Sequence, residues 1–138
     1  MFARCLKHLN PELNMIDPIE EQLDRAHRQR ENQKRIDRER ATVRGLIRAL
    51  RAAGWNPWNV HDGGDCVQTR TESAMIDAVF AVDVSTAVFK HDAAPKKCCV
   101  SFVCGEGDDI IADHSDPDSD PHAFVATINA YMTARGLI

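Results

Sequence analysis

The feature that most constrains the fold is a run of residues with no strong helix breaker, which ends only at Gly54. The run opens at Asp17-Pro18, where an aspartate cap followed by a proline at the first helical position is typical of a helix start. Gly54 suits a left-handed C-terminal cap. The pattern therefore predicts one long charged helix over residues 18–54, preceded by a weakly ordered leader over residues 1–17.

This helix is long for a chain of 138 residues. At 1.5 Å per residue, a helix of about 36 residues spans roughly 54 Å. The residues that follow Gly54 are enough for a globule only about 30 Å across. We therefore expect the helix to overhang the globule, to bend, or to pack on a second copy.

The two ends of this helix differ in their apolar residues. Near its C-terminal end, apolar residues at helical spacing predict a buried face: Val43, Leu46, Ile47 and Leu50. Near its start lies an apolar edge with no obvious neighbour in the chain: Ile16, Ile19, Leu23 and Ala26. We therefore predict that the chain forms a homodimer through the start of the helix, with Ile19 and Leu23 in the contact.

Charge divides the chain into a basic and an acidic part. Residues 19–54 carry ten Lys or Arg against six Asp or Glu, whereas residues 55–138 carry five against thirteen. One basic row has the spacing i, i+4, i+8: Arg30, Lys34 and Arg38. Such a row can track phosphates, but acidic residues stand four positions before several arginines and no aromatic residue lies among them. We therefore interpret this part of the helix first as a solvated or self-paired face and next as the contact for a protein partner, and we do not expect nucleic acid.

After Gly54 the pattern changes to short extended runs separated by turns. The expected strands are 55–61, 66–70, 84–90, 97–104 and 109–113, and the expected helices are 72–81 and 120–136. This order predicts an α+β fold, with a mainly antiparallel sheet of three to five strands and helices on one face. Residues 55–138 would form one acidic domain together with the end of the long helix. Pro57 predicts that the first strand lies at a sheet edge or starts late.

Histidines and aspartates at the expected strand ends and turns raise the hypothesis of a metal site. The candidate residues are His61, Asp62, Asp65, His91, Asp113 and His114. If these ends converge, the side chains could hold a divalent ion that activates water for phosphodiester or amide hydrolysis. Nothing in their spacing requires convergence, and no zinc-protease, serine-hydrolase or phosphate-loop signature occurs. We expect no metal and no cofactor, and keep a metal-dependent hydrolase as the alternative function.

An acidic segment before the last helix resembles a calcium-binding loop only in part. Asp116, Asp118 and Asp120 match the first three carboxylate positions of an EF-hand. The sixth and twelfth positions are Pro121 and Thr127, where that motif needs glycine and glutamate. Aspartate-proline pairs build turns and helix caps without a metal, so we interpret the segment as a solvated acidic loop.

Five cysteines contain no C-x-x-C pair, and we expect them to be reduced, mostly buried thiols: Cys5, Cys66, Cys98, Cys99 and Cys104. Adjacent Cys98 and Cys99 should point to opposite faces of a strand. Trp55 and Trp58 are expected in the core and at the rim of the domain, with ligand stacking as the alternative. No apolar run approaches the roughly 20 residues that cross a bilayer, and no signal peptide is evident. We therefore expect a cytoplasmic protein without a membrane span.

Three stretches resemble small uncharacterised proteins of phages and prophages: Leu50–Asp65, Ala78–Asp83 and Gly105–Asp113. The resemblance implies a cytosolic accessory role with no established activity, and it assigns no site residue. Together with the lack of a catalytic signature, it favours a non-enzymatic protein-interaction module that binds a host or phage protein. The candidate contact residues are Ile19, Leu23, Arg30, Lys34 and Arg38.

Overall fold

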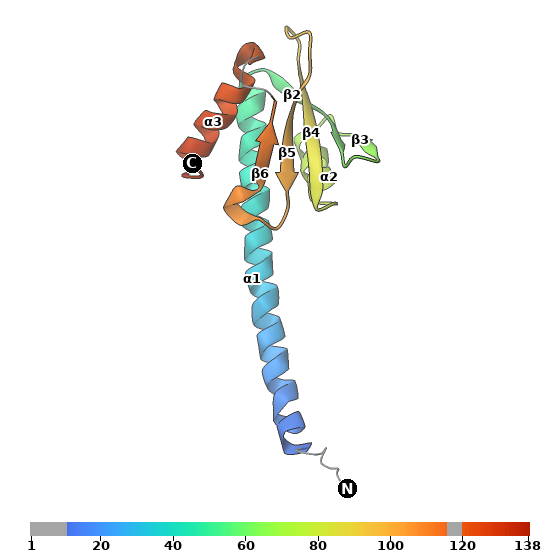
Figure 1. Cartoon of the computed structure of the whole chain (residues 1–138), viewed down its shortest axis with the longest axis vertical. Coiled ribbons are helices and arrows are strands. Elements are labelled where there is room, and N and C mark those ends of the chain that lie inside the picture. Colours follow the sequence, from blue (N-terminus) through green and yellow to red (C-terminus); the bar gives the residue numbers. More distant parts are fainter. Residues whose placement is uncertain (1–10, 116–119) are drawn as a thin grey trace. The chain divides into compact units, whose positions relative to one another are not determined.

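The structure is a computed structural model that describes residues 11–115 and 120–138, with side chains from Pro18 onward (Figure 1). The helices are α1 (Pro11–Ala52), α2 (Glu72–Val79) and α3 (Phe124–Ala134). The strands are β2 (Trp55–His61), β3 (Cys66–Gln68), β4 (Val84–His91), β5 (Cys98–Val103) and β6 (Ile111–His114). The predicted class is confirmed: a long N-terminal helix precedes an antiparallel sheet and two further helices, an α+β fold.

Helix α1 starts earlier than predicted. It begins at Pro11 and runs through Pro18, whose missing N–H removes one backbone hydrogen bond without ending the helix. The predicted start at Asp17-Pro18 therefore lies inside α1. Of the predicted leader, residues 1–10 lie outside the described residues, and residues 11–17 belong to α1.

The chain forms two compact units, and their boundary lies within α1, between Arg35 and Ile36. The second unit thus contains the end of α1 together with the whole sheet. After α1 ends at Ala52, Gly54 has a φ of +93°, a left-handed conformation that costs glycine little. A side chain at Gly54 would also collide with the ring of His91. The turn into β2 therefore needs glycine for two reasons, its left-handed backbone and the absence of a side chain.

The sheet has the strand order β3-β2-β4-β5-β6, and every neighbouring pair is antiparallel. β2 is an internal strand that begins at Trp55, so the prediction that Pro57 places it at an edge or makes it start late is wrong. Pro57 is tolerated because β3 pairs only with Asn59–His61, so the side of β2 next to Pro57 has no strand neighbour toward β3. The register with β4 shifts between Pro57 and Asn59, which leaves Trp58 as the extra residue of a bulge.

One face of the sheet packs on the helices of the second unit. The strands contribute Trp55, Val60, Ala87, Phe89, Cys98, Val100, Phe102 and Ile111 to this core. The helices contribute Val43, Leu46, Ile47, Leu50, Met75, Ile76, Val79, Phe124, Val125 and Ile128. The predicted buried stripe at the end of α1 is therefore confirmed. Because successive side chains of a strand point to opposite faces of the sheet, the remaining side chains of these strands point away from the core.

We call that opposite side of the sheet the outer face, and no helix of the described part of the chain packs on it. It carries Trp58, Asn59, His61, Thr86, Val88, Lys90, Cys99, Ser101 and Asp113. The hydroxyls of Thr86 and Ser101 share a hydrogen bond of 3.0 Å across β4 and β5. The side chains of Val84, Thr86 and Val88 alternate with the buried positions of β4 and lie on this face.

The end of α1 is fixed to α3 by a close approach at Gly45. A Cβ atom at Gly45 would collide with the phenol ring of Tyr131. The Tyr131 hydroxyl donates a hydrogen bond of 2.6 Å to the carbonyl oxygen of Thr42, one turn away. Glycine therefore remains inside α1 despite its low helix propensity because it lets α3 pack closely.

A buried carboxylate on α1 holds the turn between β5 and β6. Glu39 is only 2% exposed, and its carboxylate accepts hydrogen bonds from the backbone N–H groups of Gly105 and Gly107 at 3.1 and 2.6 Å. Gly107 has a φ of +60°, which suits glycine. The glycine-rich turn is thus a structural element anchored to α1.

Candidate functional site

Three cationic side chains gather on the indole ring of Trp58 on the outer face. The guanidinium carbon of Arg70 lies 3.5 Å from the ring centroid. The ammonium nitrogens of Lys90 and Lys97 lie 4.8 and 5.4 Å from it. All three distances are within the range of a cation–π attraction. We call Trp58, Arg70, Lys90 and Lys97 the Trp58 cluster.

The sheet topology brings this cluster together. Trp58 sits at the bulge of β2, Arg70 follows β3, Lys90 lies near the end of β4, and Lys97 directly precedes β5. Because β2 lies between β3 and β4, side chains from distant parts of the sequence meet. The backbone N–H of Thr69 donates to the carbonyl oxygen of Trp58 at 3.1 Å, which fixes the segment that carries Arg70.

The Arg70 guanidinium is held by neutral acceptors. Its Nε donates to the carbonyl oxygen of Trp58 at 3.1 Å and to Oε1 of Gln68 at 3.2 Å. Its Nη2 donates to the same Gln68 oxygen. Among the described residues, Nη1 makes no hydrogen bond. The group is therefore oriented by its neighbours while its charge remains uncompensated.

No carboxylate of the described residues lies within ion-pair distance of these three cations. Two ion pairs of the second unit lie elsewhere, between Arg40 and Asp77 and between Arg48 and Glu72. Residues 55–138 hold only five Lys or Arg against thirteen Asp or Glu, and three of those five belong to the Trp58 cluster. An acidic region that gathers its few cations in one place creates a local field that attracts anions.

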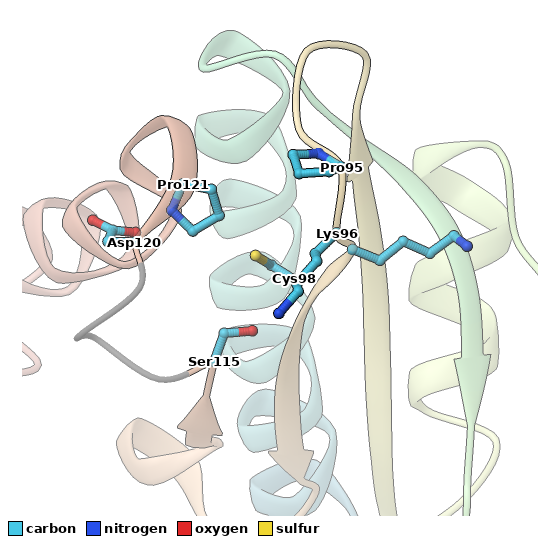
Figure 2. A pocket seen from close by; sticks show the side chains of 7 residues that line it. Pro95, Lys96, Cys98, Ser115, Asp120 and Pro121 are labelled. Carbon is cyan, nitrogen blue, oxygen red and sulfur yellow. The ribbon is translucent and has the colours of Figure 1, made fainter.

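A cavity of about 620 Å³ opens beside the start of β5 (Figure 2). It is lined by Pro95, Lys96, Lys97, Cys98, Ser115, Asp120 and Pro121. The sulfur of Cys98 points into it, and burial raises the pKa of this thiol above its ordinary value. Cys98 is therefore held as a protonated thiol, not as the thiolate that acts as a nucleophile. The segment that joins Ser115 to Asp120 lies outside the described residues.

Asp120 acts as a helix cap, as predicted. Its carboxylate accepts hydrogen bonds from the backbone N–H groups of Val125 and Ala126 at 2.6 and 3.2 Å, in the first turn of α3. The other two carboxylates of the partial calcium motif, Asp116 and Asp118, lie outside the described residues.

The structure separates the two histidines at the strand ends of the hydrolase hypothesis. His91 pairs with the first residue of β2, whereas His61 is the last residue of β2. At 3.3 Å per residue, this register puts them about 20 Å apart. Asp113 shares a row with His61 but lies three strands away, about 14 Å at the usual strand spacing.

The hydrolase candidates make local contacts in turns. Oδ1 of Asp62 accepts hydrogen bonds from the backbone N–H groups of Gly64 and Asp65 at 3.0 and 2.8 Å. These hydrogen bonds lower the pKa of Asp62, and the bond from Asp65 has the largest effect. Nδ1 of His91 accepts from the N–H of Ala93 at 3.0 Å. His91 also stacks on His122, with ring centroids 4.3 Å apart.

Asp113 and His114 are likewise engaged at the end of β6. Oδ1 of Asp113 accepts a hydrogen bond from the N–H of His114 at 2.8 Å, and Nδ1 of His114 lies 2.9 Å from the carbonyl oxygen of Ser115. Across residues 18–115 and 120–138, no group of three or more His, Cys, Asp or Glu side chains is arranged to hold a metal ion.

The described cysteines are free thiols: Cys66 is exposed, Cys98 is buried, and Cys99 and Cys104 are half-buried. Cys98 and Cys99 point to opposite faces of the sheet, as predicted. Cys5 lies outside the described residues. Burial also raises the pKa of Cys104, so neither inward-facing thiol is activated.

The predicted interaction residues are divided between the two units. Ile19, Leu23, Arg30 and Lys34 belong to the first unit, and Arg38 belongs to the second. Ile19 and Leu23 expose 65% and 66% of their surface. Nζ of Lys34 forms an exposed ion pair of 3.5 Å with Glu31. The side chain of Ile16 lies outside the described residues.

The sequence predicts Trp55 in the core and Trp58 at the rim, and both are confirmed: Trp55 is fully buried and Trp58 is half-buried. It does not predict the cations around Trp58. One signal is present, because Lys90 continues the alternation of Val84, Thr86 and Val88 on the outer face. The pairing of β2 with β4 is needed to bring Lys90 to Trp58.

Comparison of this chain with protein-family models, curated proteins and solved structures finds no match. In the described part of the chain, no helix combines the length and apolar character that a membrane span requires. Two exposed surfaces of the described residues are candidates for binding: the start of α1 and the outer face.

Proposed function

We propose that this chain is a non-enzymatic protein-interaction module that forms a homodimer through the start of α1. The observation that carries the proposal is the exposure of Ile19 and Leu23, which leave 65% and 66% of their surface in water. Because they are four residues apart, they lie on one side of the helix, together with Ala26. Burial of such side chains contributes about 25 cal/mol per Å² of apolar surface removed from water.

The charges of this segment favour a second copy in the antiparallel orientation. Its acidic residues come first: Glu20, Glu21 and Asp24. Its basic residues follow, interrupted only by Glu31: Arg25, Arg28, Arg30, Lys34 and Arg35. In an antiparallel pair that crosses near Ala26, the acidic start of one helix lies beside the basic part of the other, where flanking charges decide orientation. Ile19 and Leu23 then pack on side chains from residues 29–33 of the second copy.

The resemblance to small phage and prophage proteins is the reason to expect a host or phage protein, in the cytoplasm, as a further partner. The basic row of Arg30, Lys34 and Arg38 is the candidate contact for it. The net charge of the whole chain is −4, which opposes the approach of a nucleic acid to this row.

A metal-dependent hydrolase is the competing hypothesis, and it needs His61, Asp62, His91, Asp113 and His114 around one ion. The register of β2 with β4 puts His61 and His91 at opposite ends of a strand, which supports the binding module instead. Melting with and without a chelator distinguishes the two. A fall of several degrees that one divalent ion reverses would favour the hydrolase, because ligand stabilisation follows occupancy.

Sedimentation equilibrium of the full chain at tens of micromolar tests the proposed dimer. We expect a dimer for the wild type and a monomer for the Ile19→Gln/Leu23→Gln variant, because glutamine keeps the helix but removes the apolar contact. Asn32→Gln, on the opposite side of the same helix, is the matched control and should remain dimeric. A monomeric wild type would contradict the proposal.

Charge reversal tests the antiparallel orientation. The Glu20→Lys/Glu21→Lys/Asp24→Lys variant should weaken the dimer, because it places positive charge beside the basic part of the partner helix. Adding Arg28→Glu/Arg30→Glu/Lys34→Glu to that variant should restore the dimer. A parallel pair would lack this rescue, since like ends would already face each other.

A further inference from the structure

We propose that the Trp58 cluster on the outer face binds a short acidic segment of a partner protein, whose carboxylates contact Arg70, Lys90 and Lys97. This surface belongs to the second unit and is distinct from the exposed start of α1 in the first unit. The inference therefore goes beyond the proposed homodimer and does not depend on it.

The positive charge of the Trp58 cluster is uncompensated. Three cations lie within 5.4 Å of one ring centroid, and no carboxylate of the described residues pairs with them. Three positive charges at such short separations repel one another, and the attraction of the indole ring offsets only part of this repulsion. A bound anion removes the rest, so the folded cluster is better suited to the bound state than to the free one.

Arg70 is preorganised to bind a carboxylate. Its guanidinium stacks on Trp58, and hydrogen bonds to the Trp58 carbonyl oxygen and Gln68 fix two of its three nitrogens. Nη1 remains for a ligand. Since the side chain is already oriented, a carboxylate that binds there orders less of the protein, which favours affinity. The planar guanidinium also matches the geometry of a carboxylate.

The surroundings of the Trp58 cluster limit the size of the anion that can bind. Residues 36–138 contain ten Lys or Arg and fifteen Asp or Glu, so the surroundings of the cluster are acidic overall. A long polyanion that crossed the outer face would meet Asp113, which lies on that face, and the Asp62 turn at the far end of β2. A segment with two or three carboxylates needs only the cluster itself. The charge distribution thus favours an acidic peptide segment over a nucleic acid.

Tryptophan fluorescence of the full chain, titrated with hexaglutamate, tests the inference. The chain has only two tryptophans, and Trp55 is fully buried, so a change on binding reports mainly on half-buried Trp58. We expect a saturable change that weakens as salt is added, because exposed charges are screened beyond about 8 Å at physiological ionic strength. Hexalysine should produce no change.

Two variants of equal net charge separate the site from general electrostatics. Lys90→Gln/Lys97→Gln should weaken hexaglutamate binding roughly 5- to 30-fold, the effect of losing two partly exposed charge contacts. Arg48→Gln/Arg51→Gln removes two exposed charges elsewhere in the second unit and should bind like the wild type. Thermal melts of both variants establish that each one is folded.

Two outcomes would show that the cluster does not bind an acidic peptide: no saturable response to hexaglutamate, or equal weakening in both variants. Two further outcomes would also overturn the inference: tighter binding of single-stranded oligothymidylate than of hexaglutamate at the same salt concentration, or competition by inorganic phosphate at the concentration of hexaglutamate itself. The last two would assign the surface to nucleic acid or to a small anion. The Ile19→Gln/Leu23→Gln variant should bind hexaglutamate like the wild type, so a failed dimer and a failed acidic site give different results.

Discussion

The exposed start of α1 and the outer face of the sheet both carry basic residues, but they differ in how many acidic residues lie beside them. On α1, residues 18–35 contain five basic and four acidic residues, and Lys34 pairs with Glu31. On the outer face, Arg70, Lys90 and Lys97 surround Trp58 with no paired carboxylate among the described residues. Net charge alone therefore does not identify a binding surface. A balanced segment suits a copy of itself, whereas an unbalanced one requires a ligand of opposite charge.

The two surfaces also differ in what supports them. The outer face is formed by strands whose inward side chains, such as those of Phe89 and Phe102, form the core. Between Pro18 and Lys34, every described side chain is exposed except half-buried Ala26. Substitutions in the core beneath the outer face should therefore lower the free energy of unfolding strongly, whereas those in the exposed segment of α1 should weaken the dimer without changing the free energy of unfolding of the monomer.

The largest expected effect is that of Phe89→Ala, which removes a fully buried ring that packs 5.9 Å from the ring of Phe124. We expect the free energy of unfolding to fall by about 3–5 kcal/mol. At a protein concentration low enough to keep the chain monomeric, Leu23→Ala, at a position 66% exposed, should change it by less than about 0.5 kcal/mol. Urea unfolding followed by circular dichroism measures both. Equal losses would show that the exposed segment belongs to the same core.

Glu39 and Glu31 sharpen the contrast within α1 itself. Glu39→Ala leaves the N–H groups of Gly105 and Gly107 without their carboxylate, and we expect a loss of about 1.5–3 kcal/mol in the free energy of unfolding. Glu31→Ala removes only an exposed ion pair and should cost under about 0.5 kcal/mol. A negligible loss for Glu39→Ala in the same urea experiment would mean that water replaces these hydrogen bonds.

Alkaline pH should destabilise the second unit. Burial raises the pKa of Cys98, Cys104 and Tyr131, so the folded chain keeps these protons at pH values where the unfolded chain has lost them. Their contribution is fully present below the ordinary pKa values and is lost as the pH rises through the raised ones. We expect the free energy of unfolding to decrease above about pH 8.5, the ordinary pKa of a thiol.

Tyr131→Phe isolates one of these groups. It should cost about 1 kcal/mol at neutral pH, because the hydrogen bond to the Thr42 carbonyl oxygen is lost, and it should make the alkaline decrease shallower. Urea unfolding at several pH values gives both quantities. An unchanged pH dependence would exclude Tyr131 as a contributor.

The smallest expected effect on stability is that of Lys90→Gln/Lys97→Gln. Losing two cation–π contacts and relieving repulsion within the cluster act in opposite directions, so the free energy of unfolding should change by less than about 0.5 kcal/mol. A loss above about 2 kcal/mol in urea unfolding would mean that the cluster serves the fold and not a ligand.

The sequence predicts those parts of the fold that depend on local periodicity and turn residues. The stripe from Val43 to Leu50 and the alternation of β4 show their buried faces directly, since each depends on spacing within one element. The sequence misses the start of α1, because Pro11 and Pro18 are both acceptable first-turn residues. It misjudges β2 because an edge is a property of sheet order, which no single strand encodes.

The candidate site depends on contacts between residues that are far apart in the sequence. Bringing Arg70 and Lys90 to Trp58 requires the order β3-β2-β4 and a bulge of one residue. A shift of one residue in this register would turn Lys90 toward the core. The exposed apolar pair on α1 is predictable because Ile19 and Leu23 are related by helical spacing alone.

Native mass spectrometry of the full chain mixed with hexaglutamate tests most directly the claim that the protein has two separate binding surfaces of different chemistry. The account predicts a dimer that binds up to two peptides, with the same dimer fraction whether or not peptide is present. A chain that stays monomeric, or a dimer that dissociates when the peptide binds, would contradict it.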